Sequence, residues 1–182
     1  MLILASGSPR RRELLSLITD EFEILVSGCD EFVPEGTPAE KVPAILAEQK
    51  ALAVAKLRPE DTVIGSDTVV VLNDEIFGKP KNEEHAHDML KALSGKKHSV
   101  YTGVAVAEKG EVRSFVQKTE VEFYELSDET IEKYIATGEP MDKAGAYGIQ
   151  GKGSMLVKGI VGDYFNVMGL PVAETARFLE LV

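Results

Sequence analysis

The sequence predicts an α/β fold, because segments typical of buried strands alternate along the chain with segments of helical spacing. Residues 2–5 and Thr62–Leu72 are apolar runs of strand length. The apolar side chains of the second run occupy both of its faces, which predicts a central strand covered on each side. Between these runs, the apolar residues of 42–57 recur along one face of a long helix.

The composition is that of an ordinary globular protein of 182 residues, with 44% hydrophobic and 27% charged residues. We expect one domain over residues 1–182. A formal net charge of −10 argues against DNA or RNA as a partner, since such binding needs a basic surface. One cysteine allows no intrachain disulfide, and the first apolar run is too short for a signal peptide or a membrane span. We therefore expect a cytoplasmic protein with neither a nucleic acid nor a membrane as its partner.

The start of the sequence predicts a strand that passes into a helix through the Ser-Gly-Ser-Pro sequence at 6–9. Ser8 is a favourable N-cap, and the proline after it suits the first helical position. Arg10, Arg11 and Arg12 are unfavourable at the positive end of a helix, so we expect an anion such as a phosphate beside them. Because successive helical residues point about 100° apart, we assign the phosphate to Arg10 and expect Arg11 or Arg12 to be solvated or at an interface. The alternative is a solvated basic turn paired with nearby acids.

Two acidic residues and one lysine precede the central strand. Asp30 and Glu31 are candidate metal-binding residues, with a solvated loop as the alternative. A capping box at 37–40 predicts the start of the long helix, and Pro43 is expected to bend its second turn. Lys50 lies at the flank of the apolar stripe, and its own surroundings predict a solvated lysine.

A carboxylate, Asp67, lies in the middle of the apolar run Thr62–Leu72. Burying a charged group costs free energy unless the group is paired or bound to a metal. Asp67 is therefore the leading candidate for a metal ligand or a general base, and a structural carboxylate that caps a neighbouring loop is the alternative. Gly65 and Ser66 add little bulk before it, so we expect room for a ligand to approach the backbone there.

Asn73-Asp74 predicts a two-residue hairpin turn that returns the chain through residues 75–80. Counting back along the expected ladder places Lys79 opposite Thr68, one residue from Asp67. We therefore expect an ammonium group near the buried carboxylate. The alternative is a surface lysine at the end of an edge strand.

The other expected elements follow from caps, turns and residue spacing. They are strands at 22–26, 99–107, 112–126 and 155–157, and helices at 83–94, 128–137 and 171–179. Residues 138–169 hold eight of the sixteen glycines, which predicts tight backbone geometry in that segment. The segment is not a Walker A loop, because its glycine and lysine spacing does not match. His85 and His87 are expected to point away from each other, and His98 alone predicts no role.

Four separated segments carry motifs: Ala5-Ser6-Gly7-Ser8-Pro9-Arg10-Arg11, Gly65-Ser66-Asp67-Thr68, Gly78-Lys79-Pro80 and residues 142–151. In this order they resemble the Maf family of nucleoside triphosphate pyrophosphatases. The resemblance implies an α/β fold similar to that of the inosine triphosphate pyrophosphatases, with a central mixed sheet flanked by helices and two lobes with a cleft between them. It also implies dependence on a divalent metal cation, Mg²⁺ or Mn²⁺, and often a homodimer. The implied reaction is attack of water on the α-phosphate, which gives a nucleoside monophosphate and pyrophosphate.

The resemblance implies roles for residues at the matching positions. Asp67 is the implied proton acceptor, and Lys79 and Glu31 complete the implied catalytic group. Asp67 and Glu31 are also the implied metal ligands. The implied substrate-binding residues are Ser8, Arg10, Arg11, Lys50, Thr68 and Gln150. Of these, Arg10, Thr68 and Gln150 match positions associated with the choice of base.

The sequence Gly145-Ala146-Tyr147-Gly148-Ile149-Gln150-Gly151 resembles the branch that acts on dTTP and UTP, not the branch that acts on 7-methyl-GTP. Modified pyrimidine nucleotides are further candidate substrates. A glutamine amide can pair with N3–H and O4 of uracil and thymine, so Gln150 could read both bases. The alternative is that Gln150 braces its own loop.

A second functional hypothesis is a nucleotide-binding regulator of septum formation that does not turn over its ligand. The family's link to septum formation keeps this hypothesis open. Asp67 separates the two hypotheses, since a pure binder has no need of a buried carboxylate beside phosphates.

Overall fold

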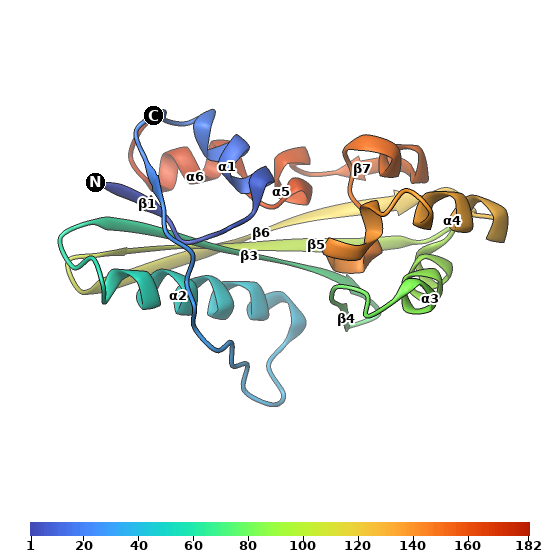
Figure 1. Cartoon of the computed structure of the whole chain (residues 1–182), viewed down its shortest axis with the longest axis horizontal. Helices are drawn as coiled ribbons and strands as arrows, with labels where there is room; N and C mark the ends of the chain where they lie inside the picture. Colours follow the sequence, from blue (N-terminus) through green and yellow to red (C-terminus); the bar gives the residue numbers. More distant parts are fainter. The chain divides into compact units, whose positions relative to one another are not determined.

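The structure, a computed structural model, describes residues 1–182 (Figure 1). It divides into two compact units. The first unit contains Met1–Thr68, Thr102–Gln117 and Gly169–Val182, and the second contains Val69–Tyr101 and Lys118–Met168. Three long strands contribute residues to both units: β3 (Thr62–Leu72), β5 (Lys97–Glu108) and β6 (Glu111–Phe123). The expected single domain and the expected cleft between lobes stay predictions.

The first unit is built on strands that follow the order β2-β1-β3-β5-β6. β1 (Leu2–Leu4) pairs in parallel with both β2 (Glu23–Ile24) and β3. One face of this sheet is covered by α2 (Val42–Ala55), which follows the short helix η1 (Ala39–Lys41). The other face is covered by α1 (Pro9–Ser16) and α6 (Val172–Phe178) (Figure 1). The predicted central strand with a covered face on each side is therefore confirmed for this unit.

Two glycines bring α2 close to the sheet. A Cβ atom on Gly65 would lie 2.1 Å from the carbonyl oxygen of Ala47, and one on Gly103 would lie 2.3 Å from the carbonyl carbon of Pro43. Only glycine allows backbones to approach so closely. The expectation that Gly65 leaves room for a ligand is wrong, because α2 fills that space.

The second unit pairs short strands with the ends of the long ones. β4 (Glu75–Phe77) is antiparallel to β3, and β7 (Val157–Val161) is antiparallel to β6. The helices of this unit are α3 (Glu83–Leu93), α4 (Asp128–Ile135), η2 (Glu139–Asp142), η3 (Ala144–Ala146), η4 (Gly151–Leu156) and α5 (Tyr164–Met168). Parallel and antiparallel pairs occur together, so the predicted α/β class with a central mixed sheet flanked by helices is confirmed.

Short capping and turn motifs in the sequence predicted the positions of several elements correctly. The Ser8 side chain accepts a hydrogen bond from the backbone N–H of Arg11 and caps α1. Asn73 and Asp74 form the predicted hairpin turn, with φ values of 51° and 64°. No helix in the structure combines the length and the apolar character needed to cross a membrane.

The long helix starts later than predicted. The Thr37 hydroxyl donates to the carbonyl oxygen of Pro34, at 2.7 Å, and therefore does not cap a helix. Residues Ala39–Lys41 form a 3-10 turn, and α2 begins only at Val42. Pro43 thus lies in the first turn of α2, where its missing N–H costs nothing, and the predicted bend is wrong.

Three predicted strands also differ from the structure, and one of them, predicted at 112–126, ends at Phe123 as β6. The strand at 22–26 shortens to β2, and residues 155–156 belong to η4. β7 begins at Val157 and continues to Val161. The glycine-rich segment before β7 forms 3-10 turns. The apolar residues at 155–157 predict a strand and give no sign of the turn.

Candidate active site

The loop between β1 and α1 presents the helix start that the sequence predicts. The backbone N–H of Ser8 donates to the Ser6 hydroxyl oxygen at 3.3 Å, and the Ser8 hydroxyl accepts from the Arg11 backbone at 3.5 Å. The first turn of α1 contains no acidic residue. Backbone N–H groups and the positive end of the helix dipole therefore remain suited to an anion.

Arg11 lies inside the first unit and contacts three segments of the chain. Its Nε donates to the carbonyl oxygen of Gly169 at 3.0 Å, while Nη1 and Nη2 donate to the hydroxyls of Ser6, at 3.4 Å, and Thr68, at 3.2 Å. The expectation that Arg11 or Arg12 is solvated or at an interface does not hold for Arg11, whereas Arg12 is exposed. Arg11 is the third residue of α1, and its side chain extends to Ser6, which follows β1, and to Thr68 in the middle of β3.

Burial lowers the pKa of the Arg11 guanidinium from its usual value, and the negative charges of Asp67 and Glu31 oppose that shift. The group stays charged at neutral pH, as arginine does in proteins. Thr68 also pairs its hydroxyl with that of Thr102, at 2.9 Å. Arg11 and Thr68 thus connect the loop between β1 and α1 with the strand that carries Asp67.

Asp67, Lys50 and Glu31 form one charged group in the first unit. The Nζ atom of Lys50 lies 2.5 Å from Oδ1 of Asp67 and 3.1 Å from Oε1 of Glu31. The Asp67 and Lys50 side chains are only 15% and 14% exposed, whereas that of Glu31 is 48% exposed. The prediction that Asp67 must be paired is confirmed. The prediction of a solvated Lys50 is wrong, because the close approach of α2 to β3 brings its ammonium to the carboxylate.

The two carboxylates suit a divalent cation. Mg²⁺ in nucleotide sites is normally bound by one or two carboxylates together with phosphate oxygens of the substrate. Asp67 and Glu31 supply two such carboxylates that converge on one ammonium nitrogen. No group of three or more His, Cys, Asp or Glu side chains could hold a metal alone. The donor set therefore fits a cation shared with phosphates, and Asp30 is exposed and outside it.

Lys79 and Gln150 belong to the second unit. Lys79 is exposed and lies two residues beyond β4. The predicted pairing of Leu72 with Glu75 is confirmed, but the ladder ends at Phe77, so it does not extend to Lys79. The expected proximity of Lys79 to the carboxylate stays a prediction.

Gln150 is half-buried and precedes η4, with an extended backbone at φ −84° and ψ 169°. Its side-chain amide forms no hydrogen bond within its own loop. No hydrogen bond of the structure supports the alternative that Gln150 braces this loop. The amide remains available to a ligand.

His98 is a residue whose position the sequence analysis missed. Its Nε2 lies 2.7 Å from the Tyr147 hydroxyl, and burial lowers its pKa to about 4, so the imidazole is neutral at physiological pH. A signal was present in the sequence: His98 shares the two-residue period of Val100 and Thr102, which are both buried.

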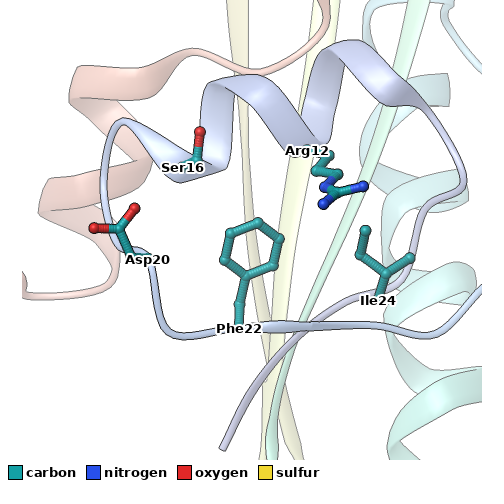
Figure 2. Close-up of a pocket in the computed structure, with 5 residues that line it drawn as sticks. All are labelled: Arg12, Ser16, Asp20, Phe22 and Ile24. Atoms are coloured by element: carbon teal, nitrogen blue, oxygen red, sulfur yellow. The ribbon is translucent and has the colours of Figure 1, made fainter.

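A hollow of about 360 Å³ lies elsewhere in the first unit, between α1 and β2 (Figure 2). Its lining residues are Arg12, Ser16, Asp20, Phe22 and Ile24. Arg12 is exposed, as expected for a solvated residue. The hollow contains none of the residues that form the charged group, and we do not assign it to the candidate site.

An α/β protein with a helix start suited to phosphate, beside a paired carboxylate and ammonium, is of a class equipped to handle phosphorylated ligands. The chain belongs to the Maf family, since the sequence model of that family, described as Maf-like protein, matches residues 1–182. The resemblance seen in the four motifs is thereby confirmed.

The chain is similar to curated relatives and to a solved structure over nearly its whole length. A dTTP/UTP pyrophosphatase of Geobacillus sp. (strain WCH70) is 55% identical over 97% of this chain and 95% of its own length. A dTTP/UTP pyrophosphatase of Bacillus cereus (strain B4264) is 50% identical over 98% of this chain and 94% of its own. A solved nucleoside-triphosphatase / dITP/XTP pyrophosphatase from Mycobacterium abscessus covers 98% of this chain and 96% of its own, with a TM-score of 0.48 and 13% identity.

Proposed function

We propose that the chain hydrolyses dTTP and UTP to the nucleoside monophosphate and pyrophosphate. The near full-length relatives that carry this activity in their names support the proposal. The observation that carries it is the Asp67 carboxylate, held within β3 at 2.5 Å from the Lys50 ammonium and next to Thr68, whose hydroxyl accepts from Arg11 of α1. A carboxylate kept in place by a cation can orient or deprotonate water.

In this mechanism Asp67 accepts a proton from the attacking water. The Lys50 ammonium orients that carboxylate and Glu31 through its two contacts. When bound, Mg²⁺ or Mn²⁺ would be held by Asp67 and Glu31 and would neutralise charge on the triphosphate. The loop at Ser8, Arg10 and Arg11 binds phosphate oxygens.

We assign Lys79 to the reaction as a further cation. It is exposed and forms no ion pair in the structure. A cation without a carboxylate partner can stabilise the charge on departing pyrophosphate. We also assign Arg10, Thr68 and Gln150 to the choice of base.

The first prediction concerns the nucleotide. We expect dTTP and UTP to be comparable substrates and CTP to be much poorer, because cytosine inverts the hydrogen-bonding pattern at N3 and at position 4. Pyrophosphate release is measured for each nucleoside triphosphate with Mg²⁺ or Mn²⁺. Equal use of CTP and UTP would refute the base assignment, and no release from any nucleotide would favour the regulator of septum formation.

The second prediction concerns Gln150→Ala. Removing the amide should narrow the preference for UTP over CTP, by about tenfold if one or two buried hydrogen bonds are lost. Values of kcat/KM for both nucleotides provide the measurement. Gln117→Ala, which removes a half-buried glutamine amide from β6 in the first unit, is the matched control and should leave the preference unchanged.

A further inference from the structure

The Glu139 carboxylate holds the backbone that follows Gln150. Its Oε1 accepts from the N–H of Lys152 at 3.1 Å, and its Oε2 accepts from the N–H of Gly153 at 3.2 Å. These N–H groups belong to the first turn of η4, where helical donors have no partner within the helix. A Cβ atom on Gly151 would lie 2.7 Å from Oε1, so the carboxylate lies directly against the turn. One side chain thus fixes two successive peptide units.

The backbone bonds from Lys152 and Gly153 lower the pKa of Glu139 below its usual value. The carboxylate is therefore charged at neutral pH. Hydrogen bonds to a charged acceptor are roughly twice as strong as those between neutral groups. The Glu139 carboxylate therefore stabilises this turn strongly.

The Tyr134 hydroxyl holds the backbone that precedes Gln150. Tyr134 is buried at the end of α4, and its Oη accepts from the N–H of Gly148 at 3.1 Å. A Cβ atom on Gly153 would lie 2.7 Å from this Oη and 2.0 Å from the carbonyl oxygen of Gly148. The two ends of the segment 148–153 therefore meet at the Tyr134 hydroxyl, and no side chain fits between them.

Tyr147 adds a third anchor to the same segment. Its hydroxyl contacts Nε2 of His98 at 2.7 Å, and its ring packs edge-on against Phe123 with 4.7 Å between centroids. All of these groups belong to the second unit. The segment is thus held from the core side at its start and by Glu139 at its end.

The side chain of Gln150 takes part in none of these contacts. The backbone around it is fixed from outside, while the amide forms no hydrogen bond within its loop. A group that must recognise a ligand with little loss of conformational entropy needs this arrangement. The segment has the features of a preorganised recognition loop.

We propose that Glu139 and Tyr134 are positioning residues that determine where the Gln150 amide lies, and thereby set the preference for uracil and thymine over cytosine. The inference rests on the proposed function of Gln150 in reading the base. Neither residue takes part in the chemistry at the α-phosphate. Their loss should therefore affect discrimination more than turnover.

The test begins with Glu139→Gln. A glutamine keeps the size of the side chain, but its NH₂ group would face a backbone N–H, so only one of the two bonds can survive. We expect the ratio of kcat/KM for UTP to that for CTP to fall about tenfold, with kcat for UTP changed no more than about twofold. Glu132→Gln, at an exposed position of α4, is the matched control and should change neither quantity.

Tyr134→Phe provides a second variant that removes a single oxygen atom, and it decides the question if Glu139→Gln does not fold. Each change is also combined with Gln150→Ala. We expect no further loss of discrimination in the combined variants, and we expect faster amide hydrogen exchange at Lys152 and Gly153 in Glu139→Gln.

Two outcomes would overturn the inference and separate it from the proposed function. If Gln150→Ala narrows the ratio while Glu139→Gln and Tyr134→Phe lower kcat/KM equally for both nucleotides, or not at all, the two residues do not position Gln150. If Gln150→Ala itself leaves the ratio unchanged, the base assignment fails and the inference fails with it.

Discussion

Asp67→Asn is expected to lower kcat for dTTP and UTP by about 10²–10⁴, the range typical of a residue that acts as a general acid or base. The amide has the shape of the carboxylate, and its carbonyl oxygen can still accept the bond from Lys50. It cannot accept a proton from water, and it brings no negative charge to a cation. The rate should therefore fall while the fold stays intact.

Pyrophosphate release at saturating nucleotide measures the rate, and thermal unfolding followed by circular dichroism checks the fold. Asp74→Asn is the matched control, because Asp74 is exposed in the hairpin turn and asparagine tolerates its φ of 64°. The control should retain normal turnover. A well-folded Asp67→Asn protein whose rate lies within about threefold of the unchanged chain would remove Asp67 from the mechanism.

Elements with local causes were predictable from the sequence. The start of α1 follows from Ser8 and the proline after it, and the hairpin follows from Asn73 and Asp74. The late start of α2 was missed although its cause is also local. The Thr37 hydroxyl has two possible partners, and in the structure it bonds the carbonyl oxygen of Pro34 instead of a helical N–H.

The candidate site was predictable in its residue types but not in its pairings. An apolar strand that contains Asp67 requires a partner for the carboxylate, yet periodicity does not say which residue supplies it. Lys50 becomes that partner because Gly65 lets α2 approach β3, and this approach depends on the tertiary fold. Arg11 is a similar case, since its acceptors Thr68 and Gly169 are distant in the sequence.

The glycine-rich segment shows where sequence patterns stop being informative. Its glycines predict tight geometry, which is found at Gly151 and Gly153. The 3-10 turn of η4 is held by Glu139, and nothing in the local pattern at 151–156 points to that carboxylate. The turn therefore includes residues 155 and 156 of the strand predicted at 155–157, and β7 begins only at Val157.

Arg11→Met is expected to lower kcat/KM for dTTP and UTP by about 10–100-fold, because small displacements of groups that position a substrate are costly. The guanidinium ties the loop at Ser6 to Thr68 on β3 and to the Gly169 carbonyl. Methionine has similar length but donates no hydrogen bond. The loop and the strand that carries Asp67 would lose this connection.

The effect of Arg11→Met on stability should be smaller, about 1–3 kcal/mol. Each acceptor keeps a second partner: Ser66 donates to the Gly169 carbonyl at 3.0 Å, Thr102 pairs with Thr68, and the Ser8 backbone donates to Ser6. Removing a buried charge also relieves the desolvation that lowers the pKa of Arg11. No acceptor is left alone, so the variant should fold.

Arg12→Met is the matched control for this prediction, since Arg12 follows Arg11 on α1 but is exposed at the hollow between α1 and β2 (Figure 2). The kcat/KM of Arg12→Met should stay within about twofold of that of the unchanged chain, because exposed charges contribute little free energy. The kcat/KM of Arg11→Lys should lie between those of Arg11→Met and Arg12→Met, because one ammonium cannot reproduce the planar fork of the guanidinium. Measurements of kcat/KM and of thermal unfolding on all three variants provide the test. Equal activity of Arg11→Met and Arg12→Met would show that the ties of Arg11 serve the fold alone.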